Sequence, residues 1–281
     1  MGKIISIINQ KGGVGKTTTS INLGASLAVA ERQTLIIDFD PQGNASSGLG
    51  INTSDNPEKT IYQALVGECT LESVIQETEL PGLFVAPADR NLSGAEVELV
   101  GALAREQKLK NILQAVKDKF HYILIDCPPS LGLLTINALT ASDSYLVPMQ
   151  CEYFSLEGLS QLSSTADLIQ GALNPRLELE GILLTMFDAR NNLAHQVSEE
   201  VKKHFGDKLF KTVIPRNVRL SEAPSHGKPI ILYDIESRGA ISYLSVAKEV
   251  IENQVEKKAA LNMSANQIST PTSINAPSAS V

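Results

Sequence analysis

The chain has few of the residues that mark several large protein classes. Its 281 residues include no tryptophan, three cysteines and four histidines. Cys69, Cys127 and Cys151 lie far apart and form no C-x-x-C pair, which argues against a disulfide framework and indicates reduced thiols. The histidines are equally scattered, so we expect no zinc or iron–sulfur site ligated by one chain.

Long apolar segments are also missing. No run approaches the roughly 18–20 apolar residues that cross a bilayer. Residues 3–8 form a short apolar run without the long hydrophobic region and cleavage site of a signal peptide, so we interpret them as a buried strand. Together these absences favour a cytoplasmic protein without stable membrane association.

Positive charge is scarce over the chain as a whole. The 24 Lys and Arg are outnumbered by 31 Asp and Glu, for a net charge of −7. A local basic face is still compatible with this total, because phosphate binding depends on where the charges lie. Residues 202–238 hold eight Lys or Arg against four Asp or Glu, a net +4 that leaves −11 for the rest.

Short β-branched runs alternate with longer helical patterns as far as about residue 254. The predicted strands are residues 3–8, 34–38, 83–86, 122–126, 145–148, 179–186 and 212–214. Several are apolar throughout, as strands covered on both faces must be. Predicted helices include residues 17–30, 156–171, 193–205 and 240–253. The pattern predicts an α/β fold with a single doubly wound, mostly parallel sheet flanked by helices.

The C-terminal part changes in composition. The helix at residues 240–253 is predicted to bury a stripe formed by Ile241, Leu244, Ala247, Val250 and Ile251. Beyond it the chain is rich in Ser, Thr, Asn, Ala and Pro. We therefore expect one domain over residues 1–254 and a disordered polar tail over residues 255–281.

A glycine-rich loop separates the first predicted strand from the first predicted helix. Its residues are Lys11, Gly12, Gly13, Val14, Gly15, Lys16, Thr17 and Thr18. Glycines let backbone N–H groups converge on phosphate oxygens, and the helix N-terminus adds its dipole. Lys16 is expected to reach the β- and γ-phosphates, Thr17 to place its hydroxyl on Mg²⁺, and Thr18 to lie near the α-phosphate. The loop predicts binding of ATP with Mg²⁺.

Lys11 departs from the standard pattern G-x-x-x-x-G-K-[ST]. Gln10 stands where that pattern has glycine, and an additional lysine follows it. A charge at the entrance of the loop cannot easily fold back onto its own phosphates. It is better placed to reach a nucleotide held by a facing subunit, so we predict a catalytic role for Lys11 across a homodimer interface.

Carboxylates follow two of the buried strands. Asp38 and Asp40 end one strand, and Asp126 ends another. In a parallel sheet these acids emerge at the C-terminal edge, where ligands bind. Asp126 fits an acid that acts on Mg²⁺ through water, and Asp40 fits the residue that orients the attacking water. Asp38 could instead be mainly structural.

These residues together resemble the deviant Walker A ATPases, and most closely the ParA/Soj partitioning proteins. The matching segments are residues 11–18, 38–44, 126–132, 148–159 and 214–224. The resemblance covers residues 1 to about 254. The chain starts directly at the first predicted strand, without the DNA-reading extension of many plasmid relatives, which favours a chromosomal type.

The resemblance implies an ATPase that is slow without its partner and dimerises when it binds ATP. Asp40 would be the hydrolytic acid, and Pro215 and Asn217 would lie against the adenine. The ATP-bound homodimer would bind double-stranded DNA of the nucleoid without sequence preference, through Arg190 and Arg219. A ParB-type centromere-binding protein would stimulate hydrolysis and release the DNA.

Related ATPase classes offer alternatives. MinD-type cell-division proteins end in an amphipathic membrane helix, whereas the tail here is polar and interrupted by proline. Amidoligases share the loop. The nitrogenase iron protein needs a bridging cluster, and Cys127 and Cys151 lie outside the loop contexts expected for it. A nucleotide-gated scaffold without turnover is a further alternative, against which Asp40 argues.

Overall fold

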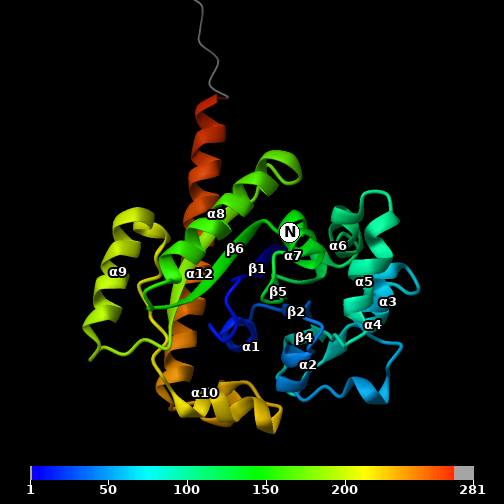
Figure 1. Cartoon of the computed structure of the whole chain (residues 1–281), viewed down its shortest axis with the longest axis horizontal. Helices are drawn as coiled ribbons and strands as arrows, with labels where there is room; N and C mark the ends of the chain where they lie inside the picture. The colour runs from blue at the N-terminus through cyan, green and yellow to red at the C-terminus, as the bar shows by residue number, and fades with distance from the viewer. Residues whose placement is uncertain (1, 269–281) are drawn as a thin grey trace, which may run out of the picture.

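A computed structural model describes residues 2–268 of the chain, with side chains up to residue 256. Seven strands form one sheet in the order β3-β4-β2-β5-β1-β6-β7 (Figure 1). They are β1 (Lys3–Ile7), β2 (Thr34–Asp38), β3 (Gln76–Glu77), β4 (Leu83–Ala86), β5 (Tyr122–Asp126), β6 (Ser144–Gln150) and β7 (Glu178–Thr185). All pairs are parallel except β3 with β4 at one edge. The predicted α/β fold is confirmed.

Helices cover both faces of the sheet. Alternate residues of a strand point to opposite faces, and each face carries its own apolar core, which the helices on that side bury. Ile5 and Ile7 of β1 belong to one core, and Ile4 belongs to the other. The first core contains α1 (Lys16–Val29), α2 (Asn44–Gly48), α10 (Val218–Glu222), α11 (Ile230–Tyr233) and α12 (Arg238–Ile268). The second contains α3 (Ile61–Val66), α4 (Leu71–Val74), α5 (Leu92–Glu98), α6 (Lys108–Leu113), α7 (Leu133–Ala141), α8 (Ser155–Ala172) and α9 (Asn192–Phe205).

The predicted strand at residues 212–214 is wrong. This extended segment lies beside β7, where Ile214 N donates to Leu184 O at 2.8 Å. The amides of Lys211 and Thr212, however, each donate at 2.9 Å to the carboxylate of Glu249 on α12, so they are not available for a ladder with β7. Only isolated bridges remain on either side.

Helix α12 is longer than predicted, and one residue of its predicted buried stripe is exposed. It continues to Ile268, so residues 255–268 are helical where the sequence predicted the start of a disordered tail. This segment contains no Gly or Pro and several strong helix formers. The rest of the predicted tail, residues 269–281, lies outside the described residues. Of the predicted stripe, Ala247 and Val250 are buried and Leu244 and Ile251 pack against the core, whereas Ile241 is 55% exposed. Tyr243 and Val246 are buried as well.

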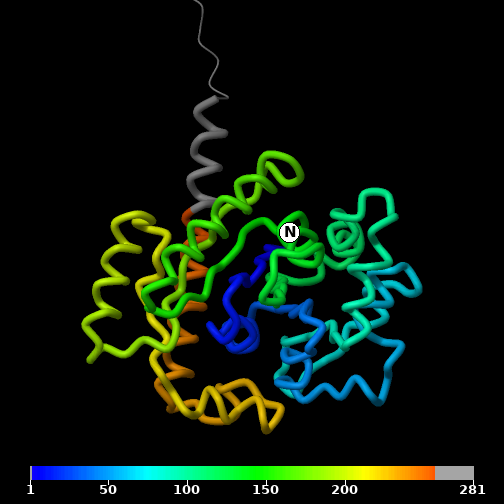
Figure 2. Tube along the Cα trace, in the orientation of Figure 1, coloured from blue at the N-terminus to red at the C-terminus, as the bar shows by residue number. Residues whose placement is uncertain are grey.

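Helix α12 packs against α1, directly behind the glycine-rich loop; the two are orange and blue in Figure 2. This packing brings the C-terminal part of the chain to the site that the N-terminal part begins. Within residues 2–268, no helix is long and apolar enough to cross a membrane.

Candidate functional site

The glycine-rich loop connects β1 to α1, and its backbone conformation requires glycine at two positions. Gly13 has φ +73° and Gly15 has φ +90°, in the left-handed region that other residues rarely adopt. Three carbonyl oxygens of the loop accept hydrogen bonds from side chains, one of them on α1 and two at the ends of β6 and β7. They are Lys11 O with Lys16 Nζ at 3.1 Å, Gly13 O with Gln150 Nε2 at 2.9 Å, and Val14 O with Thr185 Oγ1 at 2.7 Å. Such restraint suits an anion site, which needs N–H groups rather than carbonyls turned toward the ligand.

The two lysines of the loop lie in different surroundings. Lys16 is buried, with 7% of its surface exposed. Burial lowers the pKa of its ammonium group, and the negative charge of Asp126 opposes that effect. Lys11 lies at the rim, where it forms an ion pair with Glu152; the two side chains are 45% and 50% exposed. One lysine therefore faces the loop interior and the other faces the molecular surface.

Asp126 lies at the bottom of the site, at the end of β5. Its Oδ1 accepts a hydrogen bond of 2.9 Å from Ser20 Oγ. Its Oδ2 is buried and has no hydrogen-bond partner among the described residues. Burial raises the pKa of Asp126 to about 6, although the hydroxyls of Thr17 and Ser20 favour the charged form. An unpartnered carboxylate oxygen beside Thr17 fits a site for water-coordinated Mg²⁺.

Asp38 is adjacent to Asp126 in the sheet and has a structural role. Its Oδ2 accepts hydrogen bonds from Ser46 N at 2.8 Å and from Ser46 Oγ at 2.6 Å, which hold α2 against the sheet. Burial raises the pKa of Asp38 to about 7, and the nearby Asp126 adds to the effect. Two adjacent buried carboxyls thus disfavour each other's ionisation.

Asp40 follows two residues later and is 7% exposed. Its Oδ1 accepts a hydrogen bond of 3.0 Å from Gln42 N, so it also shapes the turn after β2. Its charge acts on Lys16 together with that of Asp126. The structure therefore brings together the predicted Lys16, Thr17, Asp40 and Asp126.

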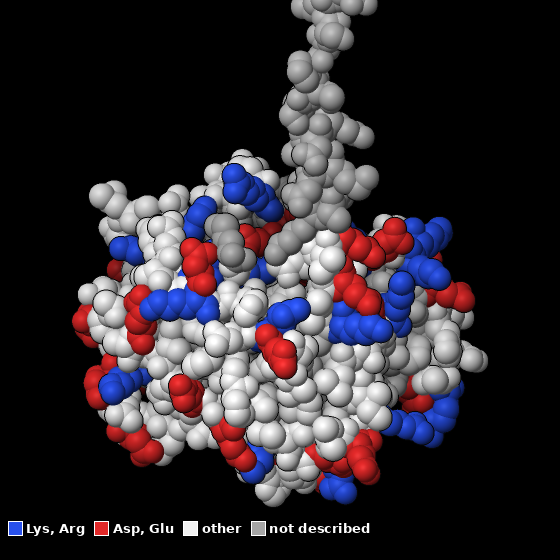
Figure 3. Space-filling model, turned by 180° about the vertical axis from the view of Figure 1, so that it is seen from behind, with Lys and Arg blue, Asp and Glu red and all other residues white. Residues whose placement is uncertain are grey.

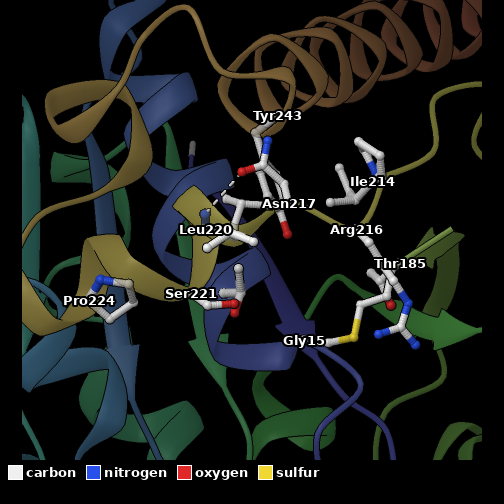
Figure 4. A pocket seen from close by; sticks show the side chains of 13 residues that line it. Gly15, Thr185, Ile214, Arg216, Asn217, Leu220, Ser221, Pro224 and Tyr243 are labelled. Carbon is white, nitrogen blue, oxygen red and sulfur yellow. Dashed lines mark hydrogen bonds between the residues drawn. The ribbon is translucent and has the colours of Figure 1, made fainter. Parts of the chain in front are cut away.

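A pocket of about 470 Å³ opens beside the loop (Figure 4). The residues that line it are Gly15, Thr18, Thr185, Met186, Ile214, Pro215, Arg216, Asn217, Val218, Leu220, Ser221, Pro224 and Tyr243. The predicted Pro215 and Asn217 are both among them, on the segment that leads into α10. Asn217 Oδ1 accepts a hydrogen bond from Leu220 N at 3.4 Å and so caps that helix. A mainly apolar pocket that adjoins a phosphate loop has the size and position for a nucleobase.

Several site residues escaped the sequence prediction. Gln150 ends β6 and Thr185 ends β7, at the same sheet edge that identified the acids, so that rule could have found them. Tyr243 extends from α12 into the pocket wall (Figure 4). Its hydroxyl shares a hydrogen bond of 3.1 Å with Thr19 Oγ1 on α1. No local signal connects Tyr243 with the loop, because the two meet only through helix packing.

The predicted DNA-binding arginines are exposed and paired with neighbouring acids. Arg190 donates to Asp188 through Nε at 3.0 Å and Nη2 at 2.9 Å. Arg219 pairs with Glu222 at 2.9 Å and with Asp234 at 3.4 Å. On the face shown in Figure 3, basic and acidic side chains are interspersed, without a continuous basic field. A DNA contact by either arginine stays a prediction.

Comparisons with known proteins agree with this geometry. The AAA domain family matches residues 2–179. The sporulation initiation inhibitor protein Soj of Bacillus subtilis is 63% identical over 253 residues, which are 90% of this chain and 100% of the relative. The chromosome partitioning protein ParA of Myxococcus xanthus is 58% identical over 92% of this chain and 90% of its own length.

Solved structures share the fold. Cobyrinic acid a,c-diamide synthase from Mycobacterium smegmatis, with bound ATP analog and magnesium, has a TM-score of 0.79 and 33% identity over 90% of this chain and 96% of its own. The cell division ATPase MinD of Pyrococcus furiosus has a TM-score of 0.73 and 30% identity over 90% of this chain and 100% of its own. The loop, the acids and the relatives lead to one assignment: the chain belongs to the Soj/ParA family of chromosome-partitioning P-loop proteins.

Proposed function

We propose that this chain is an Mg²⁺-dependent ATPase that dimerises when it binds ATP, and that its dimer attaches to DNA during chromosome or plasmid partition. One observation carries the proposal. The loop holds two lysines with opposite environments, Lys16 buried beside the acids and Lys11 exposed at the rim. Lys16 can act on a nucleotide bound in its own subunit. Lys11 lies too far out for that and is placed to act on a molecule outside the subunit.

Each residue of the site has a role in this proposal. The N–H groups of the loop and Lys16 hold the triphosphate, and the pocket at Pro215 and Asn217 holds the adenine. Thr17 and, through water, Asp126 hold Mg²⁺, which neutralises charge on the phosphates when bound. Asp40 orients the water that attacks the terminal phosphate. Hydrolysis is slow in the isolated protein because these residues alone do not complete the site.

Lys11 completes the site from the facing subunit. It leaves Glu152 and places its ammonium group on the partner's triphosphate, which offers several negative charges in place of one. The exposed ion pair that it gives up contributes only about 0.2–1 kcal/mol, so the exchange is readily driven by ATP. Dimerisation thereby depends on the nucleotide.

DNA attachment follows from dimerisation. Two copies bring together two basic segments, and affinity for the phosphate backbone rises with each contact. Arg190 and Arg219 would exchange their present carboxylate partners for DNA phosphates. A ParB-type partner would stimulate hydrolysis, separate the subunits and release the DNA. Because the ATP-bound dimer binds DNA, we propose that the protein acts at the nucleoid in the cytoplasm.

The length of α12 supports a second candidate, a MinD-type membrane-associated ATPase. A helix that reaches Ile268 could present a C-terminal segment to a membrane, and residues 257–263 include two lysines with Leu261 and Met263. Flotation with anionic liposomes in the presence of ATP tests it. Co-flotation with the vesicles would favour this candidate over DNA attachment.

DNA co-sedimentation tests the main proposal. The protein is incubated with plasmid DNA and ATP, ADP or no nucleotide, each at a low and a high salt concentration. We expect DNA binding with ATP only, and weaker binding at high salt, because phosphate contacts release counterions. Binding that is equal with ADP, or that does not respond to salt, would contradict the proposal.

A further inference from the structure

Met186, which follows β7, has an unusual backbone conformation. Among the residues that the structure describes, three other than glycine have a positive φ: Glu31, Ala104 and Met186. Glu31 and Ala104 lie in exposed turns, whereas Met186, with φ +50°, lines the pocket beside the phosphate loop. A bulky residue rarely adopts this left-handed conformation, and it persists only where the surrounding structure enforces it. Strain at this place therefore calls for a reason in the site.

The side chain of Gln150 connects Met186 to the phosphate loop. Gln150 Nε2 donates to Gly13 O and to Met186 Sδ, each at 2.9 Å. A primary amide has two N–H donors, so this nitrogen has one for each acceptor. Gln150 ends β6 and is paired with Thr185 on β7, so the register of the two strands brings it within reach of both acceptors.

The left-handed conformation lets two consecutive residues at the end of β7 serve the same loop. Thr185 lies beside Gly15 in the pocket wall (Figure 4). Its Oγ1 donates to Val14 O at 2.7 Å. In a regular strand the next side chain points to the opposite face of the sheet. Met186 departs from that alternation, and its sulfur accepts a hydrogen bond from the amide that holds the loop.

We infer that Met186 is a positioning residue of the phosphate loop, which acts through Gln150 and makes no contact with the phosphates. The inference rests on the proposed binding of a nucleotide, and it adds a physical connection between the base pocket and the loop. Gln150 holds Gly13 O so that the N–H groups of the loop can face the anion. Without the sulfur, one N–H of Gln150 loses its acceptor, and the amide turns away from Gly13 to satisfy it.

The experiment compares a ligand that carries a base with one that lacks it. Calorimetry measures the affinity of the full chain for ADP and for inorganic pyrophosphate, each with Mg²⁺; ADP avoids the proposed ATP-dependent dimer. Met186→Leu conserves the volume of the side chain and removes the sulfur. We expect it to weaken the binding of both ligands by about three- to tenfold, the range of one hydrogen bond. A side chain that contacts only the base would affect ADP and leave pyrophosphate unchanged.

A double-mutant cycle tests whether the effect passes through Gln150. Gln150→Leu should weaken both ligands to a similar degree. Met186→Leu added to it should then change pyrophosphate affinity by less than about 1.5-fold, because the two residues act as one unit. Val218→Ala is the matched control, since Val218 lines the same pocket from α10, and it should leave pyrophosphate binding unchanged. The cycle is also run with ADP, so that the result does not depend on how tightly pyrophosphate binds.

The outcomes separate this inference from the proposal beneath it. If the wild type binds neither ADP nor ATP, the proposed function fails and the inference fails with it. If the wild type binds ADP and Met186→Leu weakens ADP but not pyrophosphate, the inference alone is overturned, because Met186 then belongs only to the pocket wall. Losses that add up in the double variant, with either ligand, would also overturn it, because Met186 would act independently of Gln150.

Discussion

Replacement of Asp38 by asparagine should change how stability depends on pH. Asp38 and Asp126 lie side by side at 0% exposure, and burial raises the pKa of Asp38 from 3.8 to about 7. Because folding raises this pKa, the folded protein retains a proton that the unfolded chain releases. The free energy of unfolding therefore falls as the pH rises from about 4 to about 7. Asparagine stays neutral and can still accept the hydrogen bonds from Ser46.

The size of the effect follows from the shift. Each pKa unit corresponds to about 1.4 kcal/mol, so the roughly two units between about pH 5 and about pH 7 amount to about 3 kcal/mol. Urea unfolding of the nucleotide-free protein at about pH 5 and about pH 8 measures it. Asp38→Asn should be more stable than the wild type at the higher pH, by up to this amount, and similar at the lower pH.

An exposed carboxylate provides the control. Asp207→Asn lies on the surface and should leave the pH dependence of the wild type unchanged. Equal pH slopes in Asp38→Asn and the wild type would refute the reasoning. So would an Asp38→Asn protein that is less stable than the wild type at about pH 8.

Three further substitutions test separate parts of the site. Asp40→Ala should slow ATP hydrolysis, measured by phosphate release, at least about 100-fold, and its ATP-bound dimer should stay on DNA. Full turnover by this variant would remove Asp40 from the mechanism. Arg219→Glu should reduce DNA affinity across a salt series while the dimer persists, and Lys248→Glu on α12 serves as its control; unchanged affinity would reject the DNA contact. Gly15→Ala should lower the free energy of unfolding by about 1–2 kcal/mol, since Gly15 has φ +90°, whereas Gly12→Ala should cost less; equal costs would contradict a backbone origin.

The sheet and the phosphate site could be predicted because their signals are contiguous in the sequence. Apolar runs such as residues 122–126 identify buried strands, and the edge rule for parallel sheets places Asp40 and Asp126 beside the loop. Residues that meet only through tertiary packing left no such signal. Glu249 reaches the backbone of Thr212 from α12, and on the same helix Tyr243 is buried whereas Ile241 is exposed.

The ion pairs at the surface could not be predicted either, because they also form between residues that only the fold brings together. The sequence showed a basic stretch around Arg219, but it did not show that Asp234 would fold back to within 3.4 Å of that arginine. Glu152, likewise, is distant from Lys11 along the chain and pairs with it only because β6 ends beside the loop. The sequence therefore shows which charged side chains are present, and the packing of the fold determines which of them form ion pairs.

The most direct measurement of the central claim is ATP binding and ATP-dependent dimerisation of Lys11→Ala, compared side by side. Lys16→Ala serves as the control and should lose nucleotide binding altogether. We predict that Lys11→Ala binds ATP within about twofold of the wild type, because Lys11 points to the surface, and remains monomeric at concentrations where the wild type dimerises. A Lys11→Ala protein that dimerises with ATP as the wild type does would contradict the claim that Lys11 completes the partner's site.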